Sequence, residues 1–137
     1  MTTVVLDTNV LLDIFVFNDF RAIPIKQKLL DDQLDALATP KTIDELADVI
    51  SRPLFSLDFE TQKKIVAQWS AIARILPDNT LRTAPWQCRD PDDQVFLNLA
   101  YSAKPCLLIS KDHEILKIAN KAAKEGIIIS PDYKLTS

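Results

Sequence analysis

Four stretches of the sequence place acidic side chains beside apolar runs, and these acids are the residues best suited to chemistry. "VVLDTNVLLD" puts Asp7 straight after a short apolar run, and "LLISKDHEIL" puts Asp112 shortly after another. A carboxylate next to buried apolar residues is unfavourable unless it lies at an exposed end or binds something. The stretches "TPKTIDELADVI" and "CRDPDDQVFLNLA" carry further acids, namely Asp44, Glu45, Asp48, Asp90, Asp92 and Asp93.

Carboxylates that gather at one place favour the binding of a cation. Each negative charge raises the pKa of its neighbours, and a hard cation removes that penalty. Mg²⁺ takes oxygen ligands in octahedral geometry and keeps several waters. Two such ions can activate a water and stabilise the leaving oxygen of a phosphodiester. Several acids at one edge therefore predict a Mg²⁺ or Mn²⁺ site for phosphoryl chemistry.

Short apolar runs alternate with stretches of helical spacing, which predicts an α/β fold. The predicted strands are 4–6, 36–39, 74–76, 106–109 and 127–129. The predicted helices are 9–16, 24–34, 40–51, 58–73, 90–103 and 113–124. Continuous apolar strands separated by helices are typical of a parallel sheet that is covered on both faces.

The order of these elements explains the position of the acids. In open parallel sheets, ligands bind beyond the carboxyl ends of the strands. Asp7 follows the first predicted strand directly, and Asp112 comes just after the fourth. We therefore expect the two carboxylates to lie close together at one edge of the sheet.

The composition limits the class of protein. The chain has 137 residues, of which 47% are hydrophobic, and we expect one domain over residues 1–137 with a sizeable core. A net charge of −3 is unlike that of proteins that only coat nucleic acid, but it suits an enzyme that holds cations on carboxylates. The N-terminus lacks a basic signal region and its first apolar run is broken by Asp7, which predicts a cytoplasmic protein without a membrane segment.

The order of the motifs resembles a known family. LDTNVL, then a helix containing Glu-Leu, then DPDDQVFLNLA, then LISKDHEIL is similar to the PIN domain, and most similar to the VapC-like ribonuclease toxins of toxin–antitoxin systems. The resemblance extends from Val4 to about Ile129. It implies a three-layer α/β/α sandwich with a parallel sheet of about five strands in the order 3-2-1-4-5.

The resemblance also implies an activity, with partners and site residues. The activity is Mg²⁺- or Mn²⁺-dependent endoribonuclease cleavage that leaves a 5′-phosphate and a 3′-hydroxyl, and the partners are an RNA substrate, a cognate antitoxin protein and a second copy of the chain in a homodimer. Asn9 and Ser110 would orient acids or water, and Glu114 would add an outer ligand where many members have Asp. The implied catalytic and metal-binding residues are Asp7, Glu45, Asp93 and Asp112.

Helix capping is the alternative role for two of these acids. Asp7 and Asp112 each precede a predicted helix, and Asp is a good N-cap residue. Both roles can coexist. Glu45 has little support from its own helix, because the spacing places it opposite the apolar positions, where a solvated charge is expected.

The acids of the DPDD segment leave a choice between neighbours. Asp90 fits the N-cap of the predicted helix, and acids in a first turn are favoured by the helix dipole. Helical phase places Asp92 closer than Asp93 to the apolar stripe. The spacing implied by the resemblance favours Asp93, so Asp92 stays an alternative ligand.

Other functions fit the sequence less well. A receiver-like signalling module would need a phosphorylatable Asp after the middle strand and a Lys after the last. A haloacid-dehalogenase-type phosphatase would need a second Asp where Asn9 stands. A PIN fold kept as a catalytically silent nucleic-acid-binding or scaffold module is a third possibility, although the four filled acid positions argue against it. His113, the only histidine, receives no role.

Overall fold

Five parallel strands form the centre of the computed structural model, which describes residues 1–136. Their order in the sheet is β3-β2-β1-β4-β5, and each neighbouring pair runs parallel. The predicted sheet and its strand order are confirmed. The strands are β1 (Thr2–Leu6), β2 (Leu34–Ala38), β3 (Arg74–Ile75), β4 (Cys106–Ile109) and β5 (Ile127–Ser130).

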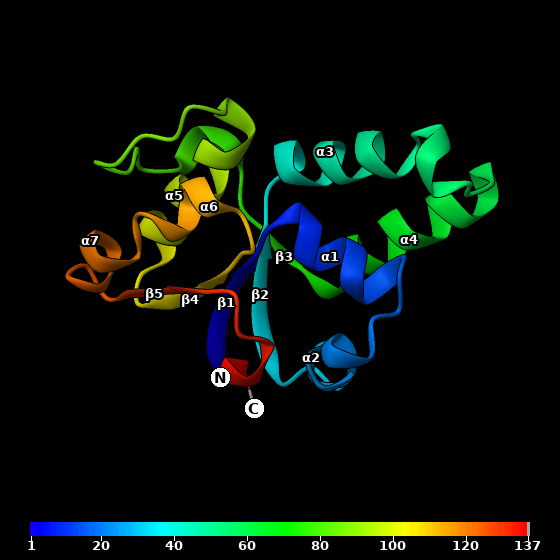
Figure 1. Ribbon diagram of the computed structural model, residues 1–137, viewed down its shortest axis with the longest axis horizontal. Coiled ribbons are helices and arrows are strands. Elements are labelled where there is room, and N and C mark those ends of the chain that lie inside the picture. Colours follow the sequence, from blue (N-terminus) through cyan, green and yellow to red (C-terminus); the bar gives the residue numbers. More distant parts are fainter. Residues whose placement is uncertain (137) are drawn as a thin grey trace.

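Helices follow the strands and surround the sheet (Figure 1). No helix within residues 1–136 combines the length and the apolar character needed to cross a membrane. The α-helices are α1 (Thr8–Phe15), α2 (Ile23–Leu30), α3 (Pro40–Ile50), α4 (Phe59–Ile72), α5 (Pro91–Ala103), α6 (His113–Leu116) and α7 (Ala119–Ala123). The short 3₁₀ helices within residues 1–136 are η1 (Phe20–Ala22), η2 (Pro53–Phe55), η3 (Asp78–Thr80) and η4 (Tyr133–Thr136).

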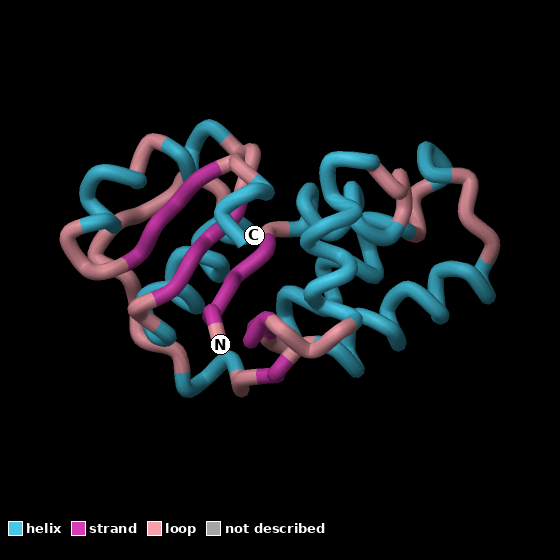
Figure 2. The backbone as a smooth tube through the Cα atoms, turned by 90° about the horizontal axis from the view of Figure 1, so that it is seen from below, coloured by secondary structure: helices cyan, strands magenta, loops and turns pink. Residues whose placement is uncertain are grey.

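The core lies in two layers, one on each face of the sheet, because side chains alternate along each strand. Val4 and Leu6 of β1 face a cluster supplied by α1 to α4, in which Trp69 is the largest fully buried side chain. Val5 faces the opposite cluster, which is supplied by α5, α6 and α7. Figure 2 shows the strands with helices on both sides. Burial on both faces explains why β4 and the end of β1 read as continuous apolar runs.

Two predicted helices differ from the structure by more than one residue. The helix predicted over 24–34 ends at Leu30, because the chain turns through Asp32 at a positive φ of 56° before β2 begins. The helix predicted over 113–124 is divided into α6 and α7. The Ile118 N–H donates to the Ile115 carbonyl at 3.0 Å, which is a tighter turn than that of an α-helix.

A polar face of α5 holds the segment that connects η3 to this helix. The Ala84 N–H donates to Oδ1 of Asn98 at 2.9 Å, and the Cys88 N–H donates to Oε1 of Gln94 at 2.7 Å. Gln94 also donates to the Trp86 carbonyl at 2.9 Å. The segment forms no helix or strand, so these side chains supply hydrogen-bond partners for its backbone groups. They also fix the segment beside the start of α5.

We expect Asn98→Ala to lower the free energy of unfolding by about 1–2 kcal/mol, because the Ala84 N–H loses its partner in a partly buried place. Asn120→Ala at an exposed position of α7 is the control, since it also replaces Asn by Ala in a helix but removes no side-chain hydrogen bond between residues in 1–136. Urea denaturation measures both. Equal stabilities of the two variants would show that the Asn98 hydrogen bond contributes nothing.

Candidate functional site

Asp7 lies at the carboxyl end of β1, in the centre of the sheet. Leu6 pairs with Ile109 of β4, and the Asp7 N–H continues this pairing by donating to the Ile109 carbonyl at 3.2 Å. Oδ1 of Asp7 accepts from the Val10 N–H at 3.2 Å, so the residue caps α1. Its side chain is buried, with 4% exposed. The capping role and the position at the sheet edge therefore coexist, as the sequence allowed.

Ser110 joins Asp7 to the loop after β4. Its hydroxyl donates to Oδ2 of Asp7, and its Oγ accepts from the Asp112 N–H at 3.0 Å. Asp112 in turn caps α6, since its Oδ1 accepts from the Glu114 N–H at 2.8 Å. The parallel pairing of β1 and β4 thus brings together two carboxylates that are far apart in the sequence.

Glu45 reaches the same end of the sheet from α3. It is half-buried, and its Oε2 accepts from the Thr8 hydroxyl at 2.8 Å. The prediction of a solvated charge, made from the phase of α3 alone, is wrong. The first residues of α1 lie against α3 and cover a face that would be exposed on an isolated helix. Thr8, which the sequence analysis did not single out, orients Glu45 through this hydrogen bond.

Asp93 lies in the first turn of α5 and faces the other acids. Asp90 caps this helix, with its Oδ1 accepting from the Asp92 N–H at 2.9 Å. Asp93 is half-buried and lines the same cavity as Asp7, whereas Asp92 is exposed. Asp92, which helical phase favoured, therefore lies outside the cavity. Asp93, which the spacing of the motif favoured, lines it.

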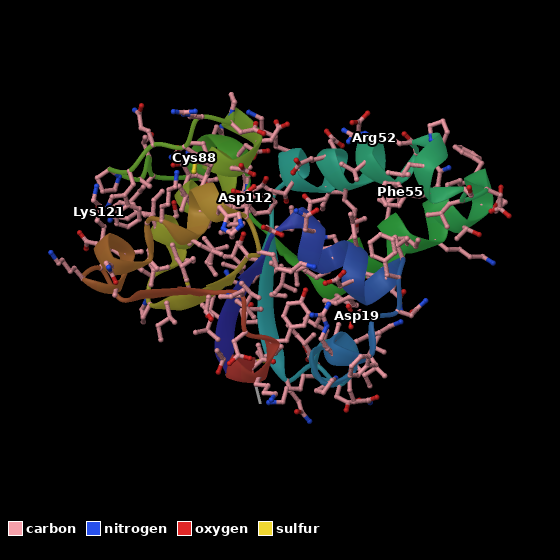
Figure 3. All side chains as sticks on the ribbon, in the orientation of Figure 1. Asp19, Arg52, Phe55, Cys88, Asp112 and Lys121 are labelled. Carbon is pink, nitrogen blue, oxygen red and sulfur yellow. The ribbon has the colours of Figure 1, made fainter. Side chains whose placement is uncertain are left out.

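One cavity of about 210 Å³ brings three of the four predicted acids together. Asp112 is not part of the lining, but Ser110 links it to Asp7, which is. Figure 3 shows Asp112 above the strands, between Cys88 beside α5 and Arg52 at the far end of α3. The lining residues are Asp7, Thr8, Asn9, Leu12, Glu45, Val49, Arg52, Phe55, Asp93 and Phe96.

The acids raise one another's pKa, and burial adds to the effect. Burial, followed by the charges of Asp112, Asp90, Asp7 and Glu45, raises the pKa of Asp93 to about 7. Burial also raises the pKa of Asp7, although the hydrogen bonds from Ser110 and Val10 oppose this. The pKa of Glu45 is raised by burial, against the Thr8 hydrogen bond. Burial and mutual repulsion therefore both disfavour the charged forms of these acids.

The predicted supporting residues differ in how closely they join this site. Ser110 binds Asp7 directly, whereas the Asn9 side chain lines the cavity and makes no hydrogen bond with other residues in 1–136. Glu114 pairs with Lys117 at 3.0 Å, and this contact lowers the pKa of the Glu114 carboxyl. Arg52, which the sequence analysis did not single out, lies at the cavity and pairs with Asp48 at 3.2 Å.

The donor set suits a hard divalent cation, because carboxylate oxygens are the ligands that Mg²⁺ and Mn²⁺ prefer. The negative charges at the site and their raised pKa values point the same way. Within residues 1–136, however, no three His, Cys, Asp or Glu side chains are already arranged so that they could hold a metal ion. A cation would therefore bind only if some of these side chains turned toward the others.

We expect Asp93→Asn to stabilise the metal-free protein at pH 8. A folded-state pKa of about 7 exceeds the ordinary value, so Asp93 stabilises the fold most at low pH and loses this contribution as pH rises through 7. Neutral Asn avoids the loss, and with solvent screening the gain at pH 8 is about 1–2 kcal/mol, shrinking toward pH 5.

Thermal and urea unfolding in the presence of a chelator measure this gain at both pH values. Asp44→Asn, at an exposed position on α3, is the control and should change stability equally little at either pH. A difference between Asp93→Asn and wild type that does not vary with pH would contradict the raised pKa.

Comparisons with known proteins support the fold. Among solved structures, the chain is similar to a chain in the crystal structure of VapBC2 from Rickettsia felis, in which VapBC2 is bound to a DNA fragment from its promoter. The two share 14% sequence identity at a TM-score of 0.62, over 93% of this chain and 97% of that chain. No curated protein matches the sequence.

The family match covers most of the sequence. The family model described as PIN domain matches residues 3–114. This range contains the four acids that the sequence singled out, and it ends within α6. The chain therefore belongs to the PIN-domain family, whose members are in general nucleases.

Proposed function

We propose that this protein is a divalent-metal-dependent endoribonuclease. One observation carries the proposal: the acids that follow β1 and β4 and the acids of α3 and α5 converge at one edge of the sheet, and the neighbouring charges that raise the pKa of Asp93 are those of four other acids. Such a cluster destabilises the protein alone, and a cation would reverse that effect. Membership of the PIN-domain family supports the same conclusion.

Asp7, Glu45, Asp93 and Asp112 would hold Mg²⁺ or Mn²⁺ in this proposal. The bound cation would supply Lewis-acid stabilisation of the charge that develops on a scissile phosphodiester. Within the chain, Ser110 holds the carboxylate of Asp7 and Thr8 holds that of Glu45, so two of the acids have fixed orientations. The products would carry a 5′-phosphate and a 3′-hydroxyl.

Arg52 is the basic side chain best placed to contact the RNA backbone. It lines the cavity together with the acids, and its side chain is 59% exposed. Its partner Asp48 is more exposed still, at 72%, so this surface ion pair is weak and can exchange for a phosphate. A guanidinium at this point would offset part of the repulsion between the acids and the RNA.

We also propose that the chain is the toxin of a toxin–antitoxin pair and that it works in the cytoplasm as a single domain and a homodimer. Large apolar side chains on its surface would suit protein partners. Leu54 is 85% exposed, Phe20 78% and Phe59 69%. The structural likeness to a chain of VapBC2 agrees with an antitoxin as one partner.

Calorimetric titration with Mn²⁺ tests the metal site. Wild type should bind at millimolar metal or below, and Asp7→Asn and Asp112→Asn should each bind at least about 10-fold more weakly, because both acids belong to one site. Asp44→Asn is the matched control and should bind like wild type. Circular dichroism confirms that each variant is folded. Equal binding by all variants would separate Asp7 and Asp112 from any shared site.

Cleavage of a mixed pool of transfer, messenger and ribosomal RNA tests the activity. Wild type should cut in Mn²⁺, stop when a chelator is added, and leave ends that a 5′-phosphate-dependent exonuclease can degrade. Asp93→Asn should lower the rate by about 100-fold or more while it keeps the fold. Metal binding without cleavage of any pool would favour the catalytically silent alternative.

A further inference from the structure

A second buried carboxylate lies near the acids, and the proposed chemistry does not use it. Asp13 on α1 is 5% exposed. Its Oδ2 accepts from Nζ of Lys111 at 2.5 Å and also from the Tyr133 hydroxyl. A buried carboxylate is stable only when it is paired and hydrogen-bonded, so these two contacts hold Asp13 in place.

The two partners of Asp13 come from different segments. Lys111 stands in the loop after β4, between Ser110 and Asp112. Tyr133 begins η4, in the C-terminal segment after β5, and it is 9% exposed. This segment lies beyond Glu114, where the PIN-domain match ends. The contact therefore joins a part of the chain outside the family match to the loop that carries Ser110 and Asp112.

The C-terminal segment is itself anchored. Nζ of Lys28 on α2 donates to the Thr136 carbonyl, and the Thr136 side chain is buried. Burial and the neighbouring Asp13 raise the pKa of Tyr133, so its hydroxyl stays protonated and donates to Asp13. Tyr133 is thus a fixed point against which Asp13 and Lys111 are held.

We propose that Asp13, Lys111 and Tyr133 are positioning residues that fix the loop of Ser110 and Asp112 against α1. Asp7 caps the start of α1 and Asp13 lies six residues further along, about 9 Å at the helical rise. The loop is therefore attached to one helix at two points, through Ser110 at Asp7 and through Lys111 at Asp13. Two attachments set the direction in which Asp112 faces, whereas with a single attachment the loop could rotate about it.

The direction in which Mn²⁺ affinity changes when Lys111 is replaced separates a positioning role from a purely electrostatic one. Lys111 is a cation close to a proposed cation site, so loss of its charge alone would tighten Mn²⁺ binding. Loss of a positioning contact would weaken it. Tyr133→Phe removes only a hydroxyl and changes no charge at neutral pH, so it reports on position alone. The inference rests on the proposed function only where metal binding is measured.

Calorimetric Mn²⁺ titration of Lys111→Met and Tyr133→Phe is the first test. Both variants should bind about tenfold more weakly than wild type, in the range seen when residues behind metal ligands are changed. Lys111→Arg should restore most of the affinity. Lys124→Met and Tyr101→Phe are the matched controls and should bind like wild type. Tighter binding by Lys111→Met together with unchanged binding by Tyr133→Phe would overturn the proposal.

Amide hydrogen exchange of the metal-free protein gives a second readout. The Asp112 N–H donates to Ser110 Oγ, so its exchange reports on the loop itself. In Tyr133→Phe this amide should exchange faster relative to the Leu108 amide in β4, which corrects for any global loss of stability. An unchanged ratio would overturn the positioning role. If wild type bound no Mn²⁺, the proposed function would fail while this ratio still decided the inference.

Discussion

The parallel pairing of β1 with β4 is the constraint on which the site depends. It places Leu6 opposite Ile109, so the next residues of both strands leave the sheet at the same level. Asp7 and Ser110 then meet although 103 positions separate them, and the loop after Ser110 carries Asp112 to the same edge. A shift of this register by one residue would turn these side chains to the opposite face of the sheet. The apolar core that fixes the register therefore also fixes the site.

Capping and site formation are one arrangement in this protein. Asp7 caps α1 and Asp112 caps α6, and each uses one carboxylate oxygen, Oδ1, for the backbone N–H groups. The second oxygen of Asp7 accepts from the Ser110 hydroxyl, whereas that of Asp112 accepts no hydrogen bond from the residues in 1–136. Helix N-termini favour negative charge, so they make the close approach of acids less unfavourable. The backbone N–H groups at the two helix N-termini thus stabilise part of the negative charge that a cation would neutralise.

The sequence predicts the sheet and the position of Asp7 and Asp112 well, because both follow from local signals. An apolar run followed by a polar turn locates the end of a strand, and parallel strands end at one edge. Glu45 could not be located in this way, since helical phase describes one helix and says nothing of the α1 residues that pack against it. Tyr133 had no local signal at all. Its contact with Asp13 joins residues that are 120 positions apart.

Asp93 and Asp7 show that burial is only one of the influences on the charge of the clustered acids. Asp7 is the more deeply buried, yet hydrogen bonds from Ser110, Val10 and Asn9 oppose the rise of its pKa. For Asp93, burial and four negative neighbours all act in the same direction, and its carboxylate accepts no hydrogen bond from another residue within 1–136. Hydrogen bonds within the protein thus stabilise the charged form of Asp7 in part, whereas Asp93 has no such support. In the proposed site, a bound cation would supply for Asp93 the stabilisation that Ser110, Val10 and Asn9 supply for Asp7.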